Sequence, residues 1–121
     1  MKRDMDLVRK ILLRLEGVPF EERSSEIDMQ GYDQQTVSFH IMLLDEAGLV
    51  KGIDASGVAE IYWFADRLTW EGYEFLEASK DDENWKRATS LVASKGGGMV
   101  FEVLKQVLVA MARDAALAAL G

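Results

Sequence analysis

The chain contains no cysteine, one histidine and one proline among its 121 residues. Without cysteine it can form no disulfide, no thiolate zinc site and no thiol nucleophile. Because small secreted domains often depend on disulfides, their absence favours a cytoplasmic location. The first sixteen residues scatter charges among apolar side chains, so we expect no secretory signal peptide.

Positive charge is also scarce, with 14 Lys and Arg against 21 Asp and Glu and a net charge of −7. Proteins that bind nucleic acid usually have a basic surface, so this balance disfavours tight non-specific DNA binding, although it allows a local basic patch. Uninterrupted apolar runs are missing as well. The longest apolar stretch, Met99 to Leu120, contains four charged residues, so we expect no membrane span.

Hydrophobic residues make up 49% of the chain and charged residues 29%. This is the ordinary composition of a globular protein, and the length suffices for one core without metals or disulfides. We therefore predict a single domain over residues 1–121. Residues 1–80 are expected to form its core, and residues 81–121 a C-terminal helical extension.

The first predicted helix begins at a cap on Asp4 or Asp6 and ends near Glu16, with apolar residues on one face and basic residues on the other. The stretch that follows contains the proline and an acidic cluster without metal-ligand spacing. Within it, Ile27 and Met29 alternate with polar neighbours, which predicts a short strand.

A second helix is predicted from Gln34 to Ala47, because Asp33 is a good N-cap and Gly48 a good residue to end a helix. The apolar arc of this helix should face the core, and it comprises Val37, Ile41, Leu44 and Ala47. The single histidine, His40, lies inside that arc and is expected to be a buried core residue. The outward face is expected to carry Gln34, Gln35, Ser38, Met42, Asp45 and Glu46.

A β-hairpin should follow, from Leu49 through a glycine-containing turn to the β-forming run at residues 60–64. Thr69 can cap a short helix whose Trp70 and Tyr73 should pack inward. The acidic residues 81–83 begin a further helix, which residues 94–98 should interrupt before a last helix from Met99 to Leu120.

Two strings of this sequence resemble known families. Val37 to Val50, VSFHIMLLDEAGLV, is similar to the recognition helix and following strand of small bacterial winged-helix regulators. Arg67 to Gly72, RLTWEG, resembles the end of their wing. Together with the opening Met1 to Leu12, these strings are closer still to the domain-of-unknown-function family 2513 (DUF2513), and the resemblance covers nearly the whole chain.

The resemblance implies a mostly helical α+β fold: a winged-helix-like core of helix, short strand, helix and β-hairpin wing, followed by C-terminal helices. It implies a bacterial or phage origin and assigns no activity. One departure is that residues 18–33 show no helical stripe where DNA-binding winged helices have a helix that braces the recognition helix.

Two functions remain open. In a DNA-binding regulator, residues at the start of the second helix would contact base edges and hairpin cations would contact phosphates. The candidates are Gln34, Gln35, Ser38, Met42, Lys51 and Arg67. In the alternative, the protein is an interaction module with a winged-helix fold that binds an unknown protein and not DNA, because the second helix has no Lys or Arg.

We expect no enzyme activity, no catalytic residue, no cofactor and no metal. The one histidine has a core position, and no pair of carboxylates has a diagnostic spacing.

The last predicted helix is apolar over most of its circumference, more than packing on one side of a small domain requires. The sequence therefore predicts a homodimer through this helix. The alternative is that the winged-helix core wraps the helix on several sides. The interface candidates are Val100, Leu104, Val107, Leu108, Met111 and Ala115.

Overall fold

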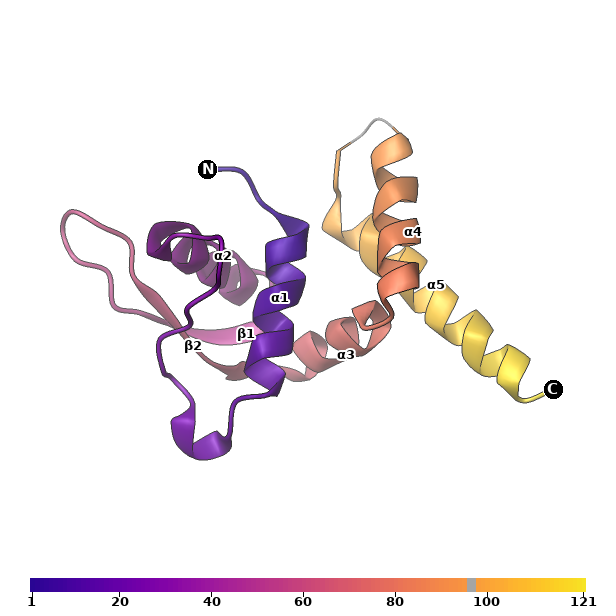
Figure 1. Ribbon diagram of the computed structural model, residues 1–121, viewed down its shortest axis with the longest axis horizontal. Coiled ribbons are helices and arrows are strands. Elements are labelled where there is room, and N and C mark those ends of the chain that lie inside the picture. The colour runs from indigo at the N-terminus through magenta and orange to yellow at the C-terminus, as the bar shows by residue number, and fades with distance from the viewer. Residues whose placement is uncertain (96–97) are drawn as a thin grey trace. The chain divides into compact units, whose positions relative to one another are not determined.

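The computed structural model describes residues 1–95 and 98–121 (Figure 1). The described residues form two compact units, Met1–Tyr73 and Glu74–Gly121. The boundary between the two units falls inside helix α3 (Trp70–Ser79). Across the described ranges there are five α-helices and a two-stranded antiparallel sheet, which confirms the mostly helical α+β class.

Helix α1 (Met5–Glu16) forms as the sequence predicts. The carboxylate of Asp4 caps it by accepting a hydrogen bond from the backbone N–H of Leu7 at 3.1 Å. Its apolar stripe is buried, and the helix contacts α2 (Gln34–Glu46) and β2 (Trp63–Leu68). The stripe comprises Met5, Leu7, Val8, Ile11, Leu12 and Leu15.

The short strand expected at Ile27 and Met29 is wrong. After the 3-10 turn η1 (Phe20–Glu22), residues 25–29 have no regular secondary structure. The sheet of the described residues has two strands, and this segment is not added to it as a third. Ile27 is nevertheless buried, and the alternation in the sequence therefore marks a loop anchored by one side chain.

Helix α2 (Gln34–Glu46) begins at Asp33, whose carboxylate accepts the N–H of Thr36 at 2.8 Å. This backbone hydrogen bond holds the pKa of Asp33 below its ordinary value. The helix is followed by Gly48 at a φ of +78°, the left-handed conformation that favours glycine. Three residues of the predicted stripe are buried, namely Val37, Ile41 and Leu44, whereas Ala47 is exposed.

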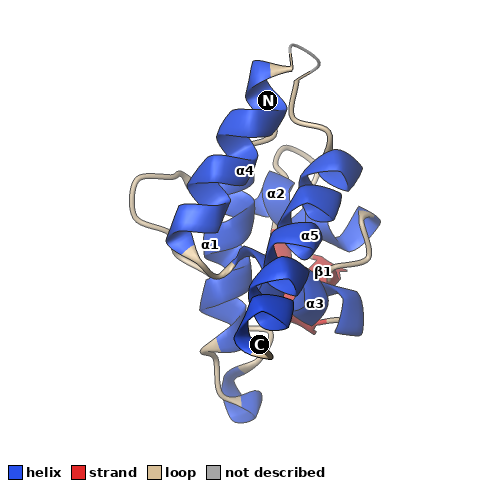
Figure 2. Ribbon diagram, turned by 90° about the vertical axis from the view of Figure 1, so that its right-hand side faces the viewer, coloured by secondary structure: helices blue, strands red, loops and turns tan. Residues whose placement is uncertain are grey.

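Strands β1 (Val50–Asp54) and β2 (Trp63–Leu68), red in Figure 2, form the expected hairpin. Residues 58–64 contain no helix. Lys51 lies opposite Arg67, but the next residue, Gly52, lies opposite Ala65. Asp66 is therefore the extra residue of a β-bulge, a feature that redirects a side chain.

The start of α3 is fixed to the turn between α2 and β1. The Thr69 backbone N–H donates to the carbonyl of Leu49 at 3.0 Å, and its hydroxyl donates to the carbonyl of Gly48 at 2.5 Å. The N–H of Gly72 in turn donates to the Thr69 hydroxyl at 3.0 Å. A Cβ on Gly72 would lie 1.9 Å from the Leu49 carbonyl oxygen, which explains the glycine that ends the RLTWEG string.

The second unit contains α4 (Asp82–Ser94), capped by Asp81, and α5 (Phe101–Ala119), which pack against each other. Phe75 joins their core, with ring centroids 5.0 Å from Phe101 and 6.5 Å from Trp85. α4 ends at Ser94 and α5 begins after Val100. The interruption expected at residues 94–98 includes residues 96–97, which lie outside the described residues.

Candidate functional surfaces

His40 is fully buried, as predicted, and both of its ring nitrogens have partners. The backbone N–H of Asp4 donates to Nε2 at 2.8 Å, so the ring proton resides on Nδ1, which donates to the carbonyl of Thr36 at 2.8 Å. The ring therefore links the start of α1 to α2. Neither nitrogen is available for a metal ion or a substrate.

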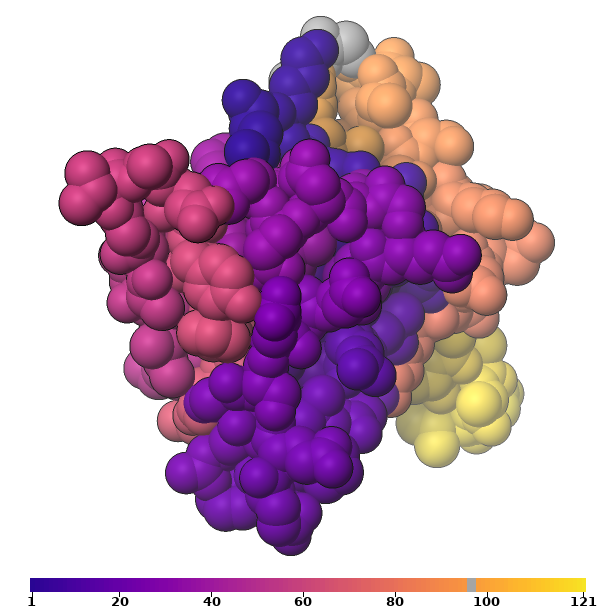
Figure 3. All heavy atoms as spheres, turned by 60° about the vertical axis from the view of Figure 1, so that its left-hand side comes forward, coloured from indigo at the N-terminus to yellow at the C-terminus, as the bar shows by residue number. Residues whose placement is uncertain are grey.

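The polar face of α2 holds the hairpin. The side chain of Gln35 donates to the carbonyl of Ile61 at 3.0 Å and accepts its N–H at 3.2 Å. The hydroxyl of Ser38 accepts the N–H of Trp63 at 3.0 Å. Ser38 is fully buried, so the outward orientation expected for it is wrong. Figure 3 shows the pink hairpin against the violet surface of α2.

Two further residues of α2 were predicted to contact DNA bases. Gln34 donates to the Ser38 hydroxyl at 3.1 Å, and Met42 is half-buried. Near the end of α2, Asp45 accepts the N–H of Gly52 at 2.9 Å. Helical periodicity alone predicts that these side chains face outward, because it carries no information about where the hairpin packs against the helix.

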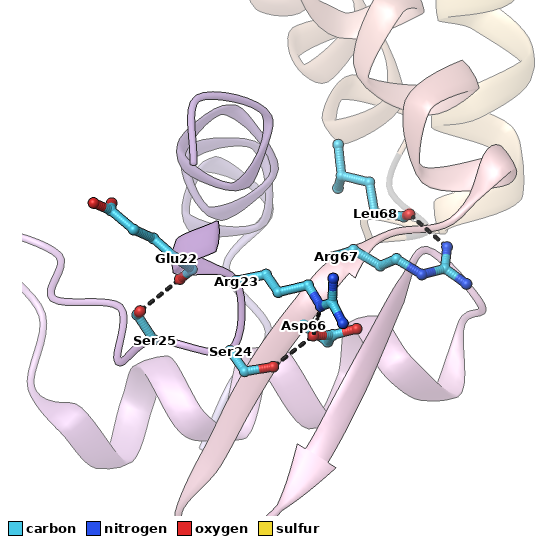
Figure 4. A network of polar contacts seen from close by, with 7 residues as sticks. All are labelled: Glu22, Arg23, Ser24, Ser25, Asp66, Arg67 and Leu68. Atoms are coloured by element: carbon cyan, nitrogen blue, oxygen red, sulfur yellow. Dashed lines mark hydrogen bonds and ion pairs between the residues drawn. The ribbon is translucent and has the colours of Figure 1, made fainter. Parts of the chain in front are cut away.

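Lys51 and Arg67 are brought together, since they lie directly opposite each other on the two strands and are both exposed. Like charges in that position repel. The bulge directs Asp66 toward the loop instead, where it accepts the Ser24 hydroxyl at 2.5 Å and pairs with Arg23 at 3.2 Å (Figure 4). Arg67 extends to the carbonyl of Leu68 at 3.2 Å.

A surface missed from the sequence lies at the start of α3. The side chains expected inside, Trp70 and Tyr73, are 77% and 47% exposed. Because Thr69 is bonded to Gly48, the exposed end of α2 with Glu46 lies beside this turn, and Glu71 is exposed next to Trp70. We call Trp70, Tyr73, Glu46 and Glu71 the aromatic surface. The sequence does contain a signal for this surface, the adjacent apolar residues Phe75 and Leu76. If this pair faces the core, as it does in the structure, Trp70 and Tyr73 lie on the other side of the helix.

The predicted dimer residues of α5 do not share one exposed face. Leu104 and Leu108 are fully buried, Val107 and Met111 are half-buried, and Val100 and Ala115 are exposed. Packing on α4 therefore uses part of the apolar stripe that the sequence analysis assigned to a dimer interface.

Among the described residues, no group of three or more His, Cys, Asp or Glu side chains is arranged to hold a metal ion. No helix in the described ranges combines the length and apolar character that crossing a bilayer requires.

The family model described as "Hypothetical protein (DUF2513)" matches residues 2–98. An uncharacterized protein of Haemophilus influenzae is 39% identical over 109 residues, which cover 88% of this chain and 92% of that protein. No solved structure matches the chain. The match to the family model includes all of the first unit except Met1 and ends before α5.

Proposed function

The chain belongs to the DUF2513 family, and from this premise we propose that it is a cytoplasmic, non-enzymatic interaction protein with a winged-helix-like first unit. Its aromatic surface binds a basic segment of a partner protein. The observation that carries the proposal is the exposure of Trp70 beside Tyr73.

An exposed tryptophan is costly to leave in water, because burying a large apolar side chain stabilises by about 1.5–3 kcal/mol. Tryptophan and tyrosine are also the side chains that concentrate in the centres of protein interfaces. Trp70 and Tyr73 are three residues apart on one helix, so a single partner segment can cover both.

Charge indicates the chemistry of that segment. Residues 1–73 contain eight Lys and Arg against fourteen Asp and Glu, a net charge of −6. Glu46 and Glu71 belong to the aromatic surface itself. A lysine or arginine of the partner is attracted by the negative charge of this unit and can lie over the indole face, where cation–π attraction adds about 0.5–1 kcal/mol.

The contacts of α2 support this function over base reading. Gln35 and Ser38 already bond the hairpin, and the helix has carboxylates at Asp45 and Glu46 but no cation. A recognition helix needs free donors and acceptors at the base edges. The position of His40 supports a non-enzymatic role, because both of its nitrogens are used inside the core.

The proposal is tested with a fluorescently labelled amphipathic peptide of lysine and leucine, and with a matched peptide that has glutamate in place of lysine. We expect the full chain to bind the lysine peptide and not the glutamate peptide. Trp70→Ser should weaken binding by about tenfold or more, which corresponds to about 1.4 kcal/mol. Binding is followed by fluorescence anisotropy.

Val58→Ser is the matched control, because Val58 is fully exposed at the distant hairpin tip and should not affect binding. Equal affinity of the wild type and Trp70→Ser for the lysine peptide would refute the proposal, since general acidity would then explain the binding. Absence of binding would refute it as well.

A second candidate, a DNA-binding regulator of bacterial or phage type, is favoured by the opposed cations Lys51 and Arg67. Two facing cations suit a phosphate backbone. If this function is correct, the chain binds duplex DNA at low salt. Arg67→Ala then lowers affinity for all sequences and reduces the salt slope by about one. Gln34 and Met42 remain the candidates for sequence preference.

A further inference from the structure

The exposed side of helix α3 combines two aromatic residues with two carboxylates. The residues at positions 70, 73, 74 and 77 are all exposed, and this spacing places them on one continuous strip of the helix surface. The strip comprises Trp70, Tyr73, Glu74 and Glu77. The buried residues of the helix lie on its other side. They are Gly72, Phe75, Leu76, Ala78 and Ser79.

The strip changes character along the helix axis, with the two aromatic residues first and the two carboxylates after them. Glu74 follows Trp70 by four residues, a spacing at which Cβ atoms lie about 5–6 Å apart. Both residues belong to one helix, so their relative position follows from helical geometry alone. A side chain that lies on the indole of Trp70 is therefore within reach of the Glu74 carboxylate.

The two carboxylates of the strip differ in their partners. Glu77 pairs with Lys80 at 3.1 Å. Within the ranges that the structure describes, the carboxylate of Glu74 takes part in no ion pair or hydrogen bond. Of the two, Glu74 is thus the one that can accept a cation from a partner without displacing a lysine of this chain.

We propose that Trp70 and Glu74 together hold one lysine or arginine side chain of the partner, with its charged group over the indole face and its N–H groups directed to the Glu74 carboxylate. This assignment rests on the proposed function, because Trp70 belongs to the aromatic surface. The indole face and the carboxylate both attract a cation, and hydrogen bonds between charged groups are stronger than neutral ones. Contact with the indole also removes water from one side of the cation, which strengthens its attraction to the carboxylate.

Tyr73 adds an apolar contact next to this cation. It is 47% exposed and lies between Trp70 and Glu77 along the strip. An aliphatic side chain of the partner can cover its ring, as apolar residues cover tyrosines in the centres of interfaces. The partner segment therefore presents an apolar residue beside the cation, and Glu74 is the residue that selects for the positive charge.

The arrangement couples the effects of Trp70 and Glu74 on affinity. If a single cation contacts both, the loss of Trp70 removes the position in which the cation meets Glu74. The carboxylate then contributes little. Two residues that act on the same group have non-additive effects, whereas residues at separate contacts have effects that add in free energy.

A double-mutant cycle measures this coupling. The labelled lysine–leucine peptide is titrated by fluorescence anisotropy with the full chain, Glu74→Gln, Trp70→Ser and the double variant. We expect Glu74→Gln to weaken binding by about threefold to tenfold in the wild-type background, and by less than about twofold in the Trp70→Ser background. The matched control is Glu60→Gln, which removes the same charge at the exposed hairpin tip and should change affinity by less than about twofold in either background.

Equal effects of Glu74→Gln and Glu60→Gln would overturn the inference, because overall charge would then explain the attraction. Effects of Trp70→Ser and Glu74→Gln that multiply in the double variant would overturn it as well, since two separate contacts would be responsible. In both cases a loss of affinity in Trp70→Ser leaves the proposed function intact. An unchanged affinity of Trp70→Ser refutes the proposed function and this inference with it.

Discussion

Replacing Gly72 by alanine separates the effect of tertiary contact from that of local helix propensity. Gly72 lies inside α3, where propensity alone predicts that alanine stabilises the helix by about 1 kcal/mol. In the fold, however, the new Cβ would lie 1.9 Å from the carbonyl oxygen of Leu49, well inside the 3.0 Å below which a neighbouring atom must shift. That oxygen is backbone and cannot rotate away.

The first turn of α3 would have to move by more than 1 Å. This movement breaks the hydrogen bond from Thr69 to Leu49, now 3.0 Å, and strains the bond from Thr69 to Gly48. Overpacking costs about 1–3 kcal/mol, and each hydrogen bond about 0.5–1.5 kcal/mol. After subtraction of the propensity gain, we expect Gly72→Ala to lower the free energy of unfolding by about 1–5 kcal/mol.

Urea unfolding followed by far-UV circular dichroism measures this change. The matched control is Gly57→Ala, because no atom lies within 4 Å of a Cβ at that position. It should change the free energy of unfolding by less than about 0.5 kcal/mol. If Gly72→Ala is as stable as the wild type, the close approach of α3 to Leu49 is wrong.

Further predictions concern the contacts of α2. Gln35→Ala removes both hydrogen bonds to the hairpin backbone and should cost about 1–2 kcal/mol in urea unfolding, with faster amide exchange in β2. His40→Leu leaves the Asp4 N–H without its acceptor and removes the side-chain bond to the Thr36 carbonyl, and it should cost about 1–3 kcal/mol. The pKa of Asp33 is lowered by its bond to Thr36, so its cap stabilises the fold above the ordinary pKa of 3.8, and this contribution is lost as the pH falls through the lower folded pKa. Asp33→Asn should remove that part of the acid sensitivity, as an acid titration by circular dichroism would show.

Local features of the fold could be predicted from the sequence because their causes are local. Asp4 and Asp33 cap the helices to which they belong, and Gly48 ends α2 in the left-handed conformation. The position of His40 followed from its place on an apolar arc. Each of these statements depends on residues within about one helical turn.

The surfaces were harder to predict because they depend on distant chain segments. Ser38 is polar and outward on an isolated helix, but Trp63, 25 residues later, covers it. Trp70 was expected inside because tryptophans are usually buried, yet the close contact at Gly72 turns the other side of α3 inward. In α5, the excess of apolar residues was evident, but periodicity cannot tell which part of it α4 covers.

The same limit explains the error at Ile27. Alternation over a few residues is compatible with a strand and with a loop that buries one side chain. The sequence pattern does not decide between them; in the structure the segment does not join the two-stranded sheet of β1 and β2 as a third strand.

The central claim, that the first unit binds a basic protein segment through Trp70 and not DNA through α2, is tested most directly by NMR. The ¹⁵N-labelled full chain is titrated separately with the lysine–leucine peptide and with duplex DNA, and the indole resonance of Trp70 is assigned with Trp70→Ser. The account predicts that the peptide shifts the Trp70 indole and the amides of Glu71 and Tyr73, while DNA shifts none of them. Shifts of Gln34, Lys51 and Arg67 on addition of DNA, with an unchanged Trp70 indole in the presence of the peptide, would contradict it.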